Sequence, residues 1–143
     1  MKKQTLFVVA LSAVLLSTAP ASMAQRVPVS MQTRHVGDDI TGIRFSQALT
    51  DDIQLSLKFS LWTGKLSELP SDGICITVRS VQVKMTDGKE LGSVIFVEAE
   101  RASGKDPGYF KVITETMWMI PKDGSVADAT HSFLADVDKK LER

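Results

Sequence analysis

The side chains in this sequence that could carry out chemistry are few and far apart. The two histidines are His35, in a predicted turn, and His131, in a predicted helix, and neither belongs to a recognisable metal or nucleophile motif. A catalytic histidine needs acids beside it, and Asp128 lies one helical turn before His131. A small enzyme that uses His35 or His131 is therefore one hypothesis, although a solvated surface histidine explains the second pair more simply.

Acidic doublets at Asp38-Asp39 and Asp51-Asp52 could be paired catalytic acids or calcium ligands. The first doublet is placed to cap a helix, and the second lies within a helix without the oxygen-ligand spacing of an EF-hand. The single cysteine, Cys75, excludes a cysteine-rich metal site and an intramolecular disulfide. We therefore predict no catalytic residue, no metal and no cofactor.

Cys75 lies in a strand-like run, Ile74–Val78. A thiol in such a run is usually a small buried side chain. The alternative is a reactive thiol or an intermolecular disulfide.

Large aromatic and methionine side chains are the remaining candidates, and they favour protein binding over catalysis. At strand spacing such residues are more often core, but the run Met117-Trp118-Met119 alternates between two faces of a strand. If helices cover only one face, either Met117 or Trp118 is exposed. The predicted partner-binding residues are Trp62, Tyr109, Met117, Trp118 and Met119.

The element that must position these residues is a long amphipathic helix predicted over 38–59. Asp38 or Asp39 can cap its first turn. Gly42 falls on its apolar side, where glycine costs about 1 kcal/mol against alanine, so this glycine should let the backbone approach the sheet closely. The apolar stripe recurs every four residues and consists of Phe45, Leu49, Ile53 and Leu57.

Short runs of alternating residues predict strands over 25–34, 59–63, 74–85, 92–102 and 109–120, followed by a last helix with Ser125 as its N-cap. In 74–85 the apolar residues change phase, and we predict a β-bulge at Arg79-Ser80 that returns them to the core face. Consecutive strands joined by short turns pair antiparallel. The predicted fold is α+β: an antiparallel sheet of about four to five strands with two helices on one face, in the order β-α-β-β-β-β-α.

Residues 1–24 have the pattern of a secretory signal peptide: Lys2 and Lys3, an apolar run over 6–16, and small residues at the cleavage positions. We predict cleavage after Ala24, with Ala21 as the alternative, and export to the periplasm of a Gram-negative bacterium. The apolar run is too short to span a membrane, and no cysteine follows the signal for a lipid anchor. Residues 25–143 then form a single domain.

Acidic and basic residues are balanced, with 17 of each. The signs are interspersed, and basic residues never cluster with aromatic ones. This pattern argues against nucleic acid or a membrane surface as a partner.

Two segments resemble the N-terminal domain of TolB proteins. Asp52–Phe59 resembles the end of the first helix of that domain, where an acid-aliphatic pair precedes a small residue and a phenylalanine. Ala129–Leu141 is similar to its closing helix, with a histidine and an aspartate at comparable spacing. The sequence departs from the family because no β-propeller follows within its 143 residues. The resemblance implies an α+β envelope domain that mediates protein contacts rather than chemistry.

These observations favour a non-enzymatic periplasmic protein that binds another protein through an uncovered sheet face or a strand edge. One alternative is an immunity-type protein that neutralises a toxin delivered to the periplasm, and another is a small periplasmic enzyme that uses His35 or His131. A homodimer through a sheet edge or through Cys75 is a further option.

Overall fold

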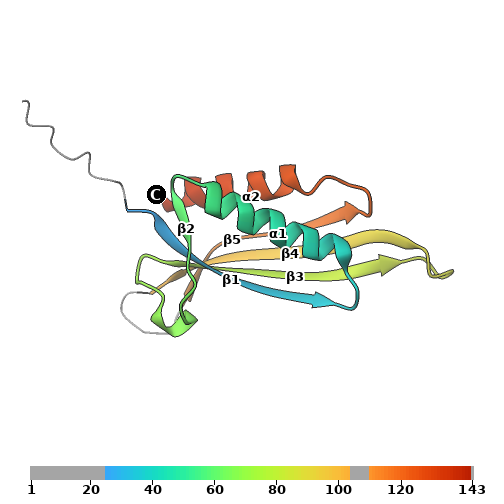
Figure 1. Ribbon diagram of the computed structural model, residues 1–143, viewed down its shortest axis with the longest axis horizontal. Helices are drawn as coiled ribbons and strands as arrows, with labels where there is room; N and C mark the ends of the chain where they lie inside the picture. Colours follow the sequence, from blue (N-terminus) through green and yellow to red (C-terminus); the bar gives the residue numbers. More distant parts are fainter. Residues whose placement is uncertain (1–24, 104–109, 143) are drawn as a thin grey trace, which may run out of the picture.

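A computed structural model describes residues 25–103 and 110–142 and contains a five-stranded sheet with two helices on one of its faces (Figure 1). The predicted α+β class and the predicted order of elements are confirmed. The signal-peptide prediction over 1–24 and Tyr109 lie outside the described residues. The elements are β1 (Val27–Val36), α1 (Ile40–Leu55), β2 (Phe59–Leu61), the 3-10 helix η1 (Leu66–Glu68), β3 (Ile74–Lys84), β4 (Glu90–Ala102), β5 (Phe110–Pro121) and α2 (Ala127–Leu141).

The sheet is mixed, with the strand order β2-β1-β3-β4-β5. β1 pairs in parallel with β2 and with β3, whereas β3, β4 and β5 pair antiparallel. The prediction of a purely antiparallel sheet is therefore wrong at β1 and β2. The reason is that α1 carries the chain back across the sheet, so β2 starts at the same end as β1 and runs parallel to it.

The core lies between the helices and one face of the sheet. α1 contributes Phe45, Leu49 and Ile53, which are all fully buried as predicted. Trp118 of β5 packs between the helices, with its ring centroid 5.7 Å from that of Phe45 and 6.1 Å from that of Phe133. The sheet completes the core with Val29, Ile74, Ile76, Val78, Ile95, Val97 and Ala99.

Both helices are shorter than predicted. α1 ends at Leu55 because Ser56 adopts an extended backbone, and Leu57 therefore leaves the apolar stripe and is 84% exposed. The prediction that Ser125 caps the last helix is also wrong. α2 begins at Ala127, and the residue at its N-cap position, Val126, makes no side-chain capping bond.

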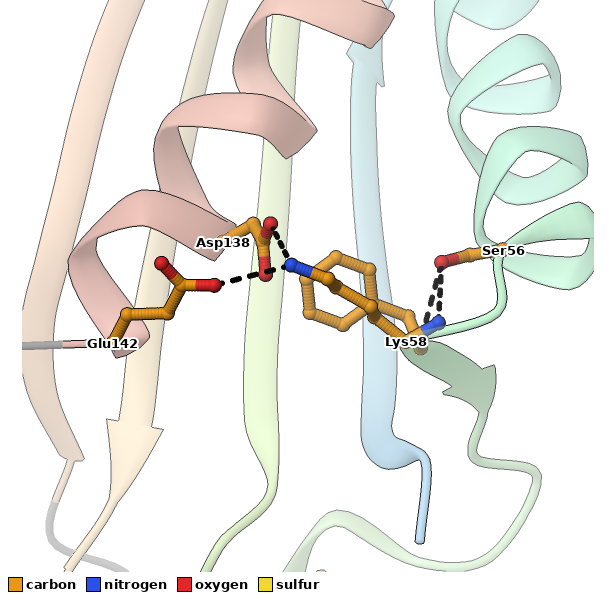
Figure 2. A network of polar contacts seen from close by, with 5 residues as sticks. Ser56, Lys58, Asp138 and Glu142 are labelled. Carbon is orange, nitrogen blue, oxygen red and sulfur yellow. Dashed lines mark hydrogen bonds and ion pairs between the residues drawn. The ribbon is translucent and has the colours of Figure 1, made fainter. Parts of the chain in front are cut away.

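The end of α1 is tied to α2 by a small polar network (Figure 2). The Ser56 hydroxyl accepts the backbone N–H groups of Lys58 and Phe59 at 3.0 and 3.1 Å. Lys58 Nζ then reaches across to Asp138 and, at 3.2 Å, to Glu142 on α2. These ion pairs are largely exposed, so each contributes little to the stability of the fold. Their main effect is to position the turn after α1 against α2.

Gly42 is the point of closest approach between α1 and the sheet, as predicted. A Cβ atom on Gly42 would lie 1.9 Å from Ser80 Oγ and 2.5 Å from Asp39 Oδ2. Only a residue without a side chain fits there.

Gly42→Ala is expected to destabilise the protein although alanine is the better helix former. The helix gains about 1 kcal/mol, but overpacking at a buried contact costs about 1–3 kcal/mol or more. We expect a net loss of up to about 2 kcal/mol in the free energy of unfolding, measured by urea denaturation. In a Ser80→Gly background, where the main obstacle is absent, the loss should shrink. A Gly42→Ala variant more stable than the wild type would contradict the observed packing.

Candidate functional site

The sheet face turned away from the helices carries exposed apolar side chains. Neither α1 nor α2 covers this face (Figure 1). Strand register places Val36, Val81, Val94 and Met119 in one row across it. The neighbouring row contains Phe96 and Met117 between the same strands. We call these side chains the apolar patch: Val36, Val81, Val94, Phe96, Met117 and Met119.

Exposure distinguishes the apolar patch from the core. Val36 is 59% exposed, Met117 68% and Met119 50%. Trp118, between the two methionines, points to the opposite face and into the core. Of the two alternatives predicted for this run, the exposed side chains are therefore the methionines and not Trp118.

The strand β3 supplies apolar residues to both faces. The bulge predicted at Arg79-Ser80 is wrong, because the pairing of β3 with β4 continues without a shift until Val83. Ile74, Ile76 and Val78 face the helices, while Val81 remains on the open face. The change of phase in the sequence thus marks the start of the apolar patch, and this was the signal that sequence reasoning misread.

Basic residues border the apolar patch on one side. Arg34 and Arg79 pair across β1 and β3, and the Arg79 guanidinium lies 5.7 Å from the ring centroid of Phe96. Such a cation–π contact holds the arginine over the patch without neutralising its charge. A shallow groove of about 330 Å³ is lined by both arginines and by Val36, Val81, Val94 and Phe96.

Acidic residues follow farther along the same face. Glu98 and Glu115 occupy the next outward row, and Glu100 lies beyond them. Burial raises the pKa of the Glu100 carboxyl, and the nearby charge of Glu98 raises it further, while Arg79 acts in the opposite direction. The open face is therefore divided into an apolar region with basic neighbours and an acidic region.

Cys75 belongs to this face but is only 2% exposed. Burial raises the pKa of its thiol, and the charges of Glu100 and Glu98 raise it too, although a hydrogen bond with Thr77 lowers it. The protonated thiol is a weak nucleophile. A disulfide to another chain would first require this buried thiol to become exposed.

The remaining predicted partner-binding residues are not gathered at the apolar patch. Trp62 follows β2, which lies at the opposite edge of the sheet from β5. Its indole N–H donates to the carbonyl of Lys65 at 3.1 Å. Of the predicted residues that the structure describes, Met117 and Met119 lie on the patch and Trp62 and Trp118 do not. Sequence reasoning missed the other four members of the patch.

A buried polar cluster surrounds the start of α1. His35 Nδ1 lies 2.7 Å from Ser80 Oγ, and His35 Nε2 lies 3.3 Å from Ser46 Oγ. The carboxylate of Asp39 accepts the N–H of Gly42 at 2.9 Å and the hydroxyl of Ser93. The two serines beside His35, Ser80 and Ser46, are 4% and 6% exposed. The cluster fixes the first turn of α1 to β1, β3 and β4.

Asp39 is fully buried and its pKa is lowered. Burial alone raises the pKa of this carboxyl, but the hydroxyls of Ser80 and Ser93 and the Gly42 amide outweigh it, with a smaller contribution from His35. Hydrogen bonds to the charged form are the physical cause of the net shift. Asp39 thus remains a carboxylate inside the cluster.

His131 lies elsewhere, on the exposed side of α2. Its Nε2 is 3.0 Å from Asp52 Oδ1, and the Thr130 hydroxyl donates to Asp52 Oδ2 at 2.6 Å. This histidine lines a groove of about 430 Å³ between the helices, whereas His35 lines a separate groove beside β1. Among the described residues no three histidine, cysteine or acidic side chains form a group that could hold a metal ion.

No helix within the described ranges is both long enough and apolar enough to span a membrane. The resemblance to TolB proteins stays a prediction. Comparison of the sequence with models of known protein families and with curated proteins found no match.

Proposed function

We propose that this protein is exported to the periplasm and acts without catalysis, by binding another protein through the apolar patch. The observation that carries the proposal is the position of Met117 and Met119, which are exposed on a face that the described helices leave uncovered. Binding is favoured when a partner removes exposed apolar groups from water. Methionine is suited to this role because its flexible, polarisable side chain adapts to the partner surface.

The charges around the apolar patch define the kind of partner. Arg34 and Arg79 flank the patch, and Arg79 is held in place over Phe96. The complementary surface has an apolar centre with a carboxylate placed opposite the arginines. We therefore propose a folded partner that places acidic side chains opposite the two arginines and keeps them away from Glu98 and Glu115, which border the patch in the next row.

Photo-crosslinking from defined positions tests the binding proposal in cells. A photoreactive amino acid at position 117 should give a discrete adduct, while the same amino acid at position 57 should not, because Leu57 is 84% exposed but lies away from the patch. The partner identified in the adduct is then purified without the crosslink. It is titrated with the wild type and with the Met117→Glu and Arg79→Glu variants. Each variant should weaken binding by about tenfold or more, since a charge in a desolvated contact costs several kcal/mol.

Two outcomes would contradict the binding proposal. An adduct of two copies of this chain would assign the apolar patch to self-association. Equal crosslinking from positions 117 and 57 would show that the patch is not a specific surface. Export is tested separately, because protein recovered from the periplasmic fraction should begin at Gln25, the residue after the predicted cleavage site.

A further inference from the structure

One edge of the sheet is only half paired. β2 pairs with β1 over Val27–Val29 alone, whereas β3 follows the other side of β1 as far as Val36. Beyond Val29, the β2 side of β1 has no neighbouring strand in the part of the chain that the structure describes. We call this stretch, from Met31 to Val36, the free edge.

Strand alternation identifies the backbone groups that the free edge presents. The N–H of Val27 donates to the carbonyl of Lys58, and the carbonyl of Val29 accepts the N–H of Trp62, both at 2.8 Å. Alternate residues of a strand direct their backbone groups to the same side. The residues whose N–H and C=O groups point outward from the free edge are therefore Met31, Thr33 and His35.

A groove of about 390 Å³ accompanies the free edge along the flank of α1. Ile43, Gln47 and Asp51 line its helix side, and Thr33 and His35 line its strand side. Asp51 is the only carboxylate in this lining, and no lysine or arginine belongs to it. The groove is therefore apolar at the Ile43 end and acidic at the Asp51 end.

The spacing along α1 matches that of an added strand. α1 runs back along β1, so Ile43 lies toward His35 and Asp51 lies toward the start of the strand (Figure 1). Eight helical residues rise by about 12 Å, and four strand residues span about 13 Å. Residues i, i+2 and i+4 of a strand beside β1 would then meet Ile43, the middle of the groove and Asp51 in turn.

We propose that the free edge and its groove bind an extended segment of another protein as an additional β-strand. The segment runs antiparallel to β1, the direction with the more stable ladder. It carries an aliphatic residue against Ile43, a small hydroxyl residue two positions later and a lysine or arginine against Asp51. This site uses a different surface from the apolar patch, so it does not depend on the function proposed above.

A synthetic peptide tests the proposal directly. A short acetylated, fluorescently labelled peptide with the central sequence Ile-Thr-Ser-Thr-Lys should bind saturably to the full mature protein, as measured by fluorescence anisotropy. Replacing the peptide lysine with glutamate should weaken binding by about tenfold or more. Two further peptides carry N-methyl groups on alternate backbone nitrogens in the two opposite phases. One phase should abolish binding and the other should retain it, because only one set of N–H groups faces β1.

Variants of the protein locate the binding site. Thr33→Pro removes an outward N–H at a position where an edge strand tolerates proline, and should weaken peptide binding by about tenfold or more. Thr33→Val keeps the N–H and changes only the groove-lining side chain, so it should weaken binding far less than Thr33→Pro does. Asp51→Lys changes an exposed side chain, so it should fold normally, lose the lysine peptide and bind the glutamate peptide.

Several results would overturn the proposal. These are no saturable binding, binding that ignores the N-methyl phase, or binding unchanged by Asp51→Lys. A wild-type protein that sediments as a dimer and becomes monomeric with Thr33→Pro would assign the free edge to a second copy of the chain instead. The Met117→Glu variant should bind the peptide as the wild type does. The proposal for the free edge can therefore fail without the proposal for the apolar patch failing, and the reverse.

Discussion

Replacing Phe45 with alanine is expected to lower the free energy of unfolding by about 3–5 kcal/mol, the usual cost of truncating a buried phenylalanine. Phe45 is fully buried and contacts the Trp118 ring across the interface of α1 with the sheet. The void would lie beside Trp118 of β5, which also contacts Phe133 of α2. Urea denaturation followed by circular dichroism measures the loss.

Gln47→Ala is the matched control for Phe45→Ala. It lies two residues farther along α1, is exposed, and should change stability by no more than about 0.5 kcal/mol. If Phe45→Ala cost less than about 1 kcal/mol, α1 could not be packed on the sheet as described.

Asp39→Ala should have the second largest effect, a loss of about 2–4 kcal/mol. The substitution removes the N-cap of α1, worth about 1 kcal/mol. It also leaves the fully buried hydroxyl of Ser93 without its acceptor, which costs about 1–3 kcal/mol. Asp38→Ala is the control, because Asp38 precedes the same helix but is exposed.

The contribution of Asp39 should depend on pH. Its folded pKa lies below the ordinary value of 3.8, so the stability it confers is present above that value and is lost as pH falls through the folded pKa. The difference in unfolding free energy between the wild type and Asp39→Asn should therefore be constant near neutral pH and shrink below about pH 4. A difference that grows on acidification would show that the carboxylate is not stabilised by its hydrogen bonds.

Local patterns predicted much of the fold. The four-residue spacing of Phe45, Leu49 and Ile53 identified the buried side of α1, and Gly42 was correctly assigned to a close backbone approach. Leu57 was misplaced because the helix end depends on Ser56, whose hydroxyl bonds to two backbone amides beyond it. Spacing alone does not show where such a local competitor ends a helix.

Other features depend on contacts between distant segments. The parallel pairing of β1 with β3 joins residues that no turn connects, so hairpin signals cannot reveal it. The apolar patch was misread because a strand with apolar residues in both phases is equally consistent with a bulge and with a bare face. The cluster of His35 and Asp39 forms only when β3 and β4 bring their serines to the start of α1.

The position of β1 between β2 and β3 has a consequence for how the chain reaches its native state. Its main neighbour is β3, and their first paired residues, Val29 and Ile74, are 45 positions apart. β3, β4 and β5 are joined by local hairpins, so they close smaller loops and should assemble first. During synthesis from the amino end, β1 therefore stays unpaired and the apolar face of α1 stays exposed until the middle of the sequence has been made. A chaperone that holds unfolded chains would be expected to bind this early segment.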